Sequence, residues 1–361
     1  MLYASEGLLY ICFAILTGAL LLRLVPEDRR PSVVVPHPLL LVIVAAIPIL
    51  SFAPIHQLTV SLIKDIEMSY GEMAKVIILE FNLGKAWLWT AVGCCGLFLI
   101  LQLKAFRNDK HMPYIALFIT FLLFVWVGFG SHASSLYTFK GLVVHSLHFM
   151  SVSVWIGILF VISWFSRDQN NWESFLRWFS PVAIVSVIVA LTAGFLLMSF
   201  TTEQYLNSWM LPYGQMMLIK HLLLLPLLLF AFSNGFIYRS VIKKHENFQP
   251  RGWLRAESLL ALLVLFATAV MGEQAPPHNV KDTLQTTSPS SLFKSFYQGS
   301  FSPDLQLQFT LDTESLLMFA AALLMAGGVI WTYRNQRLIP SVLMGLLASL
   351  FGYFGLMFAI A

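Results

Sequence analysis

The stretch GLVVHSLHFMSVSVWIGILF, residues 141–160, contains no charged residue and decides the class of fold. A helix that crosses about 30 Å of hydrocarbon needs about 20 apolar residues, which is the length of this run. The run also carries His145 and His148, three residues apart, so that both imidazoles share one helix face. Polar side chains are costly inside a membrane and commonly face a pathway or one another. The stretch therefore predicts a membrane-spanning helix that carries a functional pair of histidines.

The rest of the 361-residue chain has the same character. Hydrophobic residues make up 58% of it and charged residues 11%, and the mean hydropathy is +0.76. This composition is typical of a polytopic membrane protein rather than of a soluble domain. The net charge of +4 is dispersed among short connections, so we expect the lipid bilayer as a partner and no nucleic acid.

Ten apolar runs are long enough to span a bilayer, and they lack the alternation of a barrel strand. They lie near residues 5–25, 37–56, 84–105, 113–132, 138–165, 175–200, 213–238, 253–272, 314–333 and 338–360. We therefore predict an all-α fold, a polytopic transmembrane bundle of about ten helices.

The positions of the basic residues orient this bundle. If the N-terminus lies outside, the odd-numbered connections face the cytoplasm and hold fifteen of the 22 Lys and Arg residues, including every arginine. These are Arg23, Arg29, Arg30, Lys104, Arg107, Lys110, Arg167, Arg177, Arg239, Lys243, Lys244, Arg251, Arg255, Arg334 and Arg337. The bias matches the positive-inside rule and predicts an N-terminus outside.

Two outer connections are long enough to fold. Residues 57–83 mix apolar and acidic positions and predict an amphipathic helix at the membrane surface. Residues 273–313 are rich in Pro, Ser and Thr and predict a flexible outer loop.

Four histidines fall within the predicted spans, on the outer side. His132 lies near the outer end of the fourth span, His145 and His148 lie in the fifth, and His221 lies in the seventh. With a rise of about 1.5 Å per residue, the last three lie roughly 10 Å below the outer ends of their helices. His37, His111 and His245 fall in or near cytoplasmic connections, where polar neighbours make them ordinary surface residues.

This shared depth predicts a site for a soft metal that opens to the outside. Imidazole suits copper and zinc, and a methionine thioether adds a preference for Cu(I). Met217 and Met271 are available at the same level. The alternative interpretation is that each histidine only forms a hydrogen bond to a neighbouring helix. Gly141, Gly157 and Gly194 are expected to allow close helix packing around the site.

Several motifs are absent from the sequence. The chain has no Gly-rich phosphate loop, no Walker pattern and no phosphorylated-aspartate motif, which argues against an ATP-driven pump. It also has no nucleophile elbow and no HExxH motif, so we predict that the protein is not an enzyme.

Four segments, in order, resemble the copper resistance protein D (CopD) family of bacterial copper transport proteins. They are GFGSHASS from Gly128, HSLHFMSVSVWIG from His145, the helix with Gly214, Lys220 and Asn234, and the helix with Arg255 and Glu257 that ends before Pro276 and Pro277. The resemblance covers roughly residues 1–277. The chain departs from the family pattern at Ser131, where a glycine is expected, and at Gly235, where an arginine is expected.

The resemblance implies copper uptake across the bacterial cytoplasmic membrane. Copper ion would then be the ligand, and an extracytoplasmic copper-binding protein is a candidate partner. It also implies a core at residues 1–277, an extracytoplasmic loop at 278–313 and two additional C-terminal helices at 314–361. The candidate metal ligands are His132, His145, His148, His221, Met217 and Met271.

Two other functions are compatible with the same residues. A membrane haem protein needs only two histidines from different helices as axial ligands, for which His145 or His148 opposite His221 would serve. A copper-delivery factor for respiratory oxidase assembly would bind the metal without transporting it. A Soret band would identify the first, and flux measurements in vesicles would separate the second from a transporter.

Overall fold

The computed structural model describes residues 2–104, 106, 109, 111–237, 249–274, 276–297, 299 and 301–360. Within these residues the chain is helical, with no strand and two isolated β-bridges. Ten helical segments of the described residues, two of which (His37–Leu62 and Pro212–Ile237) each join two consecutive helices, are long and apolar enough to cross a membrane, which confirms the predicted multi-pass bundle. Six residues that the sequence places in or near cytoplasmic connections lie outside the described residues: Arg107, Lys110, Arg239, Lys243, Lys244 and His245.

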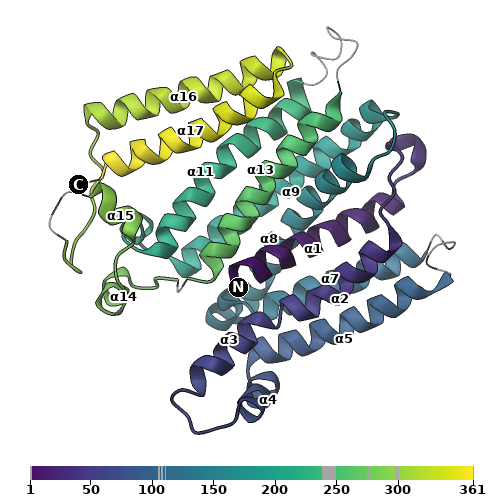
Figure 1. Ribbon diagram of the computed structural model, residues 1–361, viewed down its shortest axis with the longest axis horizontal. Coiled ribbons are helices and arrows are strands. Elements are labelled where there is room, and N and C mark those ends of the chain that lie inside the picture. Colours follow the sequence, from purple (N-terminus) through teal and green to yellow (C-terminus); the bar gives the residue numbers. More distant parts are fainter. Residues whose placement is uncertain are drawn as a thin grey trace. The chain divides into compact units, whose positions relative to one another are not determined.

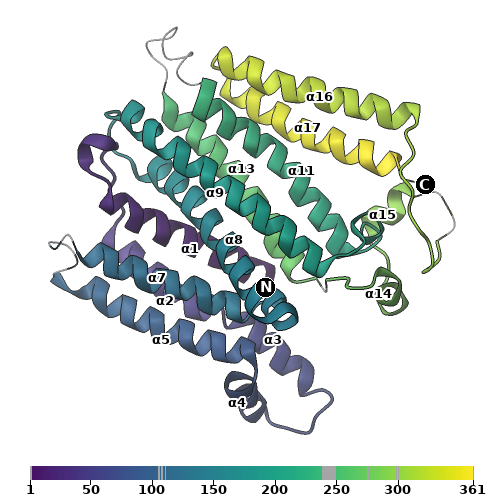
Figure 2. The ribbon, with the colours of Figure 1, turned by 180° about the vertical axis from the view of Figure 1, so that it is seen from behind.

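The chain divides into two compact units, Met1–Phe200 and Thr201–Ala361 (Figure 1). The helices of the first unit are α1 (Leu2–Leu24), η1 (Glu27–Arg29), α2 (His37–Leu50), α3 (Ala53–Leu62), α4 (Tyr70–Glu80), α5 (Asn82–Gln102), α7 (Met112–Phe129), α8 (His132–Phe165) and α9 (Trp172–Thr201). Within this unit α1 packs against α2, α7 and α8, and α5 packs against α2 and α7 (Figures 1 and 2).

The contact between α1 and α8 depends on two glycines. A Cβ atom at Gly18 would lie 2.1 Å from the carbonyl oxygen of Gly157, and a Cβ at Gly157 would lie 2.1 Å from the carbonyl oxygen of Ala14. The two backbones therefore touch, as small residues permit in membrane helices. This confirms the close packing that was expected at Gly157. An aromatic cluster of Phe13, Phe124 and Phe149, with ring centroids 5.0 Å apart, fills the adjoining space between α1, α7 and α8.

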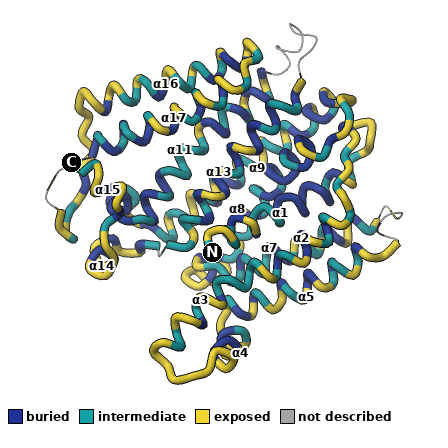
Figure 3. The backbone as a smooth tube through the Cα atoms, in the orientation of Figure 1, coloured by how far each residue is buried: buried dark blue, intermediate teal, exposed yellow. Residues whose placement is uncertain are grey.

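The predicted outer segment 57–83 forms a helical hairpin. Helices α3 and α4 enclose a small apolar cluster built on Ile55, Met73 and Ile77, and their other faces are largely exposed (Figure 3). A capping box starts α4: the Ser69 hydroxyl accepts from the Glu72 amide, and the Glu72 carboxylate accepts from the Ser69 amide. The hydrogen bonds from Ser69 lower the pKa of the Glu72 carboxyl group.

The helices of the second unit are α10 (Tyr205–Ser208), α11 (Pro212–Phe232), the π-helix η2 (Ser233–Ile237), α13 (Pro250–Gly272), α14 (Val280–Thr286), α15 (Ser291–Phe296), α16 (Thr313–Arg334) and α17 (Leu338–Phe358). Helix α11 is central, because it packs against α13, α16 and α17. The C-terminal helices therefore pack directly on the helices that precede the 273–313 connection.

A buried polar network links three of these helices. The Asn234 amide donates to Glu257 Oε2 at 2.7 Å and accepts from the Tyr333 hydroxyl at 3.0 Å. Tyr333 is fully buried, and Glu257 is 2% exposed. Because buried polar groups require partners, Tyr333 of α16 ties the C-terminal pair to the polar groups of η2 and α13.

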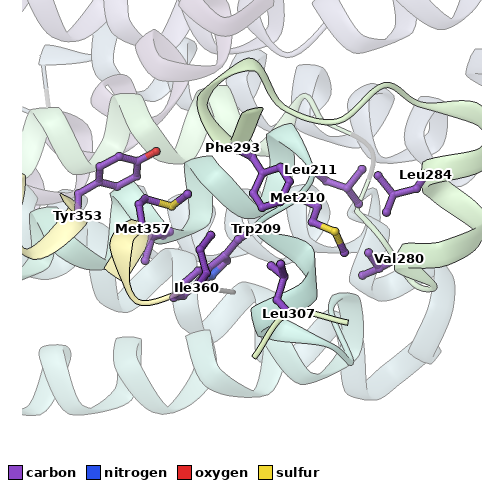
Figure 4. Close-up of a cluster of buried hydrophobic side chains, with 11 residues drawn as sticks. Trp209, Met210, Leu211, Val280, Leu284, Phe293, Leu307, Tyr353, Met357 and Ile360 are labelled. Atoms are coloured by element: carbon purple, nitrogen blue, oxygen red, sulfur yellow. The ribbon is translucent and has the colours of Figure 1, made fainter. Parts of the chain in front are cut away.

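The connection 273–313 is more ordered than its composition predicts. It contains α14 and α15, and its side chains Val280, Leu284, Phe293 and Leu307 join Trp209, Met210 and Met357 in one buried cluster (Figure 4). Polar contacts fix it as well, since Asn207 donates to Gln306 at 2.6 Å and accepts from the Leu307 amide at 2.9 Å. In the described residues the segment is therefore a packed cap on its unit, rather than the flexible loop that was predicted.

Replacing Gly157 with alanine tests the α1–α8 contact. The added methyl group overlaps backbone atoms, so the helices must separate, and we expect a loss of about 1–3 kcal/mol in stability. The measurement is the midpoint of thermal unfolding in detergent. Gly96→Ala on α5 is the matched control, because nothing lies within 4 Å of the Cβ position there. Equal midpoints for the two variants would contradict the contact.

Tyr333→Phe tests the buried network. The variant leaves the Asn234 amide oxygen without its donor, which should cost about 1–3 kcal/mol. Tyr114→Phe, at a residue that is 58% exposed, should leave stability unchanged. An unfolding midpoint for Tyr333→Phe equal to that of the control would argue against the network as the link to α16.

Candidate metal site

Helix α8 carries three of the six predicted ligands and is not one continuous helix. Tyr137 (φ −117°, ψ 17°) and Thr138 (φ 46°, ψ −119°) interrupt it with non-helical backbone. Ser131 is the N-cap of α8, since its hydroxyl accepts from the Ser134 amide. The serine that departs from the family pattern therefore has a local structural role.

The interruption folds the first turns of α8 back onto the helix. The position of a Cβ on Gly141 lies 1.9 Å from the carbonyl oxygen of Ala133, so residues 133 and 141 touch through their backbones. This confirms the close packing expected at Gly141. It also corrects the predicted fourth span, which does not reach His132: α7 ends at Phe129, and His132 is the first residue of α8.

His132 is exposed, and the folded-back turn carries it toward His145, because Ala133 touches Gly141 one turn before His145. The Nδ1 atom of His145 is buried and has no hydrogen-bond partner among the described residues. Its ring meets Phe149 edge to face, with centroids 6.5 Å apart. A buried nitrogen without a partner is costly, and a bound ligand would satisfy it.

His148 is held by α9. Its Nδ1 lies 2.8 Å from the carbonyl oxygen of Ala190. A carbonyl oxygen only accepts, so Nδ1 carries a proton, and in the neutral ring Nε2 then carries the lone pair. Metal-bound histidines commonly have their other nitrogen fixed in this way. Gly194 leaves room for the ring, because a Cβ there would lie 3.3 Å from His148 Cε1.

The other three candidate ligands lie in the second unit. His221 Nδ1 is 2.9 Å from the Tyr205 hydroxyl of α10, and the two rings are 5.7 Å apart. Burial raises the pKa of Tyr205, which keeps its hydroxyl protonated. His221 can ligate a metal through Nε2 only when its Nδ1 carries the proton and donates to Tyr205. Met217 is 3% exposed on α11, whereas Met271 is partly buried near the end of α13.

The six ligands are therefore divided between the units, three in each. Across the described part of the chain, no group of three or more His, Cys, Asp or Glu side chains is arranged to hold a metal ion. The first unit turns the segment that carries His132 back toward His145 and anchors His148. A meeting of these residues with His221, Met217 or Met271 stays a prediction.

The residues that position the histidines were not identified from the sequence. Nothing in the sequence indicates that the Ala190 carbonyl and the Tyr205 hydroxyl bind histidines. Only Gly194 could be identified, as a small residue in an apolar run. The reversal at Thr138 had no signal, because a β-branched residue seldom adopts a positive φ.

The chain is similar to known proteins in two comparisons. The family model described as "Copper resistance protein D" matches residues 173–271, which run from α9 to the end of α13. The resemblance to the copper resistance protein D family is confirmed. "Copper transport protein CutJ" of Bacillus subtilis (strain 168) is 27% identical over 209 residues, which are 54% of this chain and 37% of that protein. The chain thus spans little more than a third of the length of this relative, and no solved structure matches.

The copper resistance protein D match contains His221, Met217 and Met271, but the histidines of α8 lie before it. It also contains Asn234 and Glu257, two motif residues far apart in sequence that form a direct hydrogen bond. Gly235, the second departure from the family pattern, lies in the π-helix η2 beside Asn234.

The tautomer of His148 is open to direct measurement. Nitrogen-15 NMR of the ring-labelled protein in lipid should show a protonated Nδ1 and an unprotonated Nε2, because the Ala190 carbonyl requires a donor. A protonated Nε2 with a bare Nδ1 would refute the hydrogen bond to α9. His148→Gln removes the signal and serves to assign it.

Proposed function

We propose that this protein carries copper across the bacterial cytoplasmic membrane, inward, through a histidine site in the outer half of α8. Two kinds of observation support this. The family model and the relative are both named for copper, and ten apolar helices suit a membrane carrier. The observation that carries the proposal is the buried Nδ1 of His145, which has no hydrogen-bond partner among the described residues and lies three residues from His148, whose Nδ1 faces a carbonyl oxygen.

The chemistry of the donors fits copper. Neutral imidazole nitrogens bind copper in both oxidation states, and a thioether favours Cu(I). The Ala190 carbonyl holds the Nδ1 proton of His148, so Nε2 can receive the ion without a tautomer change. His132 would receive the ion at the entrance, before it reaches His145 and His148. His221, Met217 and Met271 would complete the pathway from the second unit.

The orientation proposed for the bundle sets the direction of entry. With the N-terminus outside, the folded-back turn of α8 and the hairpin of α3 and α4 face the extracytoplasmic side. Copper, handed over by an extracytoplasmic copper-binding protein, would reach His132 first and His145 next.

We divide the chain into three segments with the same orientation in the membrane. Residues 1–277 would form the transporting core, 278–313 an extracytoplasmic loop and 314–361 a C-terminal pair of helices. Two contacts support a bracing role for that pair: the Tyr333 hydrogen bond to Asn234, and the packing of α17 on α11.

Copper accumulation by cells that express variants tests the proposal. His145→Ala and His148→Ala should each reduce uptake to near background and weaken copper binding by the purified protein at least about tenfold, since even outer-shell partners are commonly worth 10–100-fold in affinity. His111→Ala, at an exposed residue just before α7, should match the wild type. Unchanged uptake and binding in both α8 variants would overturn the site, and a Soret band in the purified protein would point to haem instead.

A further inference from the structure

The break in α8 decides whether His132 can reach His145. The two residues are thirteen positions apart, so an unbroken helix would separate them by roughly 20 Å along its axis. Instead, the first turns fold back so that Ala133 touches Gly141, one turn before His145. The reversal therefore brings the exposed His132 toward His145, whose Nδ1 is buried.

Thr138 makes this reversal at an energetic cost. Its φ of 46° is positive, a conformation that is uncommon outside glycine and a real outlier for a β-branched residue. Strained backbone of this kind persists only where surrounding contacts over-determine it, and it is frequent at functional sites.

Three contacts hold the strained conformation in place. Gly141 has no side chain, and any Cβ there would overlap the Ala133 carbonyl. Ser131 caps the folded-back turn by accepting from the Ser134 amide. The Tyr137 ring stacks on Phe200 of α9, with centroids 4.3 Å apart and an interplanar angle of 27°.

The folded-back turn points toward His145, which has an unsatisfied ring nitrogen. The Nδ1 of His145 is buried and without a partner in the described part of the chain. Within the described residues, no group of three or more His, Cys, Asp or Glu side chains is arranged to hold a metal, so an ion bound here would rely on a smaller set of donors. A folded-back turn that ends in a histidine supplies the type of donor that a two-coordinate soft metal would need beside His145.

We propose that Thr138 and Gly141 are positioning residues for copper binding: they hold residues 131–137 as an arm that places His132 beside His145, so that the two imidazoles form the entry site. This inference rests on the proposed function, because it takes copper as the ion. The arm itself is a property of the protein without metal and is tested separately.

The first test is a distance measurement without copper. Spin labels are attached at His132→Cys and Arg167→Cys, at the start and just past the end of α8, and the native Cys12, Cys94 and Cys95 are replaced by alanine. Pulsed electron paramagnetic resonance then measures the distance between the two labels. At about 1.5 Å per residue, an unbroken helix would place these backbones about 52 Å apart, and the folded arm about 39 Å apart. The arm predicts the short distance, and the long one would overturn it.

Two variants then link the arm to the ion. Gly141→Ala should lengthen the label distance and, in the unlabelled protein, weaken copper binding at least tenfold. Thr138→Gly should keep both the short distance and the affinity, because glycine adopts a positive φ without strain. Gly96→Ala is the control for added methyl groups.

The outcomes separate the two claims. A longer distance in Gly141→Ala with unchanged copper affinity would overturn the positioning role, whereas the proposed uptake could still stand on His145 and His148. A short distance in a wild-type protein that binds no copper would overturn the proposed function and the ligand role of His132, and would leave the folded arm as a purely structural feature.

Discussion

The direct backbone contact between α1 and α8 is the constraint on which the rest of the first unit depends. Gly18 and Gly157 let the two helices approach until a single added Cβ would collide with a carbonyl group. In a membrane, where lipid is as apolar as the side chains, such contact replaces the hydrophobic effect as the force between helices. Because α8 is fixed along α1, its N-terminal half, which carries the three histidines, has a defined position in the first unit.

The N-terminal half of α8 then has to accommodate imidazole groups that are costly inside a membrane. The three histidines differ in their surroundings: His148 donates to the Ala190 carbonyl, His132 is exposed at the start of the helix, and the buried Nδ1 of His145 has no partner in the part of the chain that the structure describes. A helix that used its imidazoles only for interhelical hydrogen bonds would not leave the buried Nδ1 of His145 without a partner among the described residues. The unpaired nitrogen beside a satisfied one is the arrangement expected of a site that awaits a ligand.

The sequence predicts the spans well because length and apolar content are local properties. Runs of about 20 apolar residues can cross a bilayer only as helices, so the count of ten follows from hydropathy. The spacing of His145 and His148 likewise places them on one helix face. The position of His132 could not be predicted, because it depends on Thr138 adopting a backbone conformation against its preference. The sequence also did not indicate that the 273–313 connection is folded. Its Val280, Leu284 and Phe293 are widely spaced among turn residues, and they form a core only when Trp209 and Met357 supply the other half.

The central claim is that the histidines of α8 hold copper, and X-ray absorption at the copper edge tests it most directly. The wild-type protein loaded with one equivalent of Cu(I) should show nitrogen neighbours with the outer-shell scattering of at least two imidazoles. That pattern should fall to one imidazole, or vanish, in His145→Ala. A spectrum without imidazole scattering, or one identical in the wild type and the variant, would contradict the account.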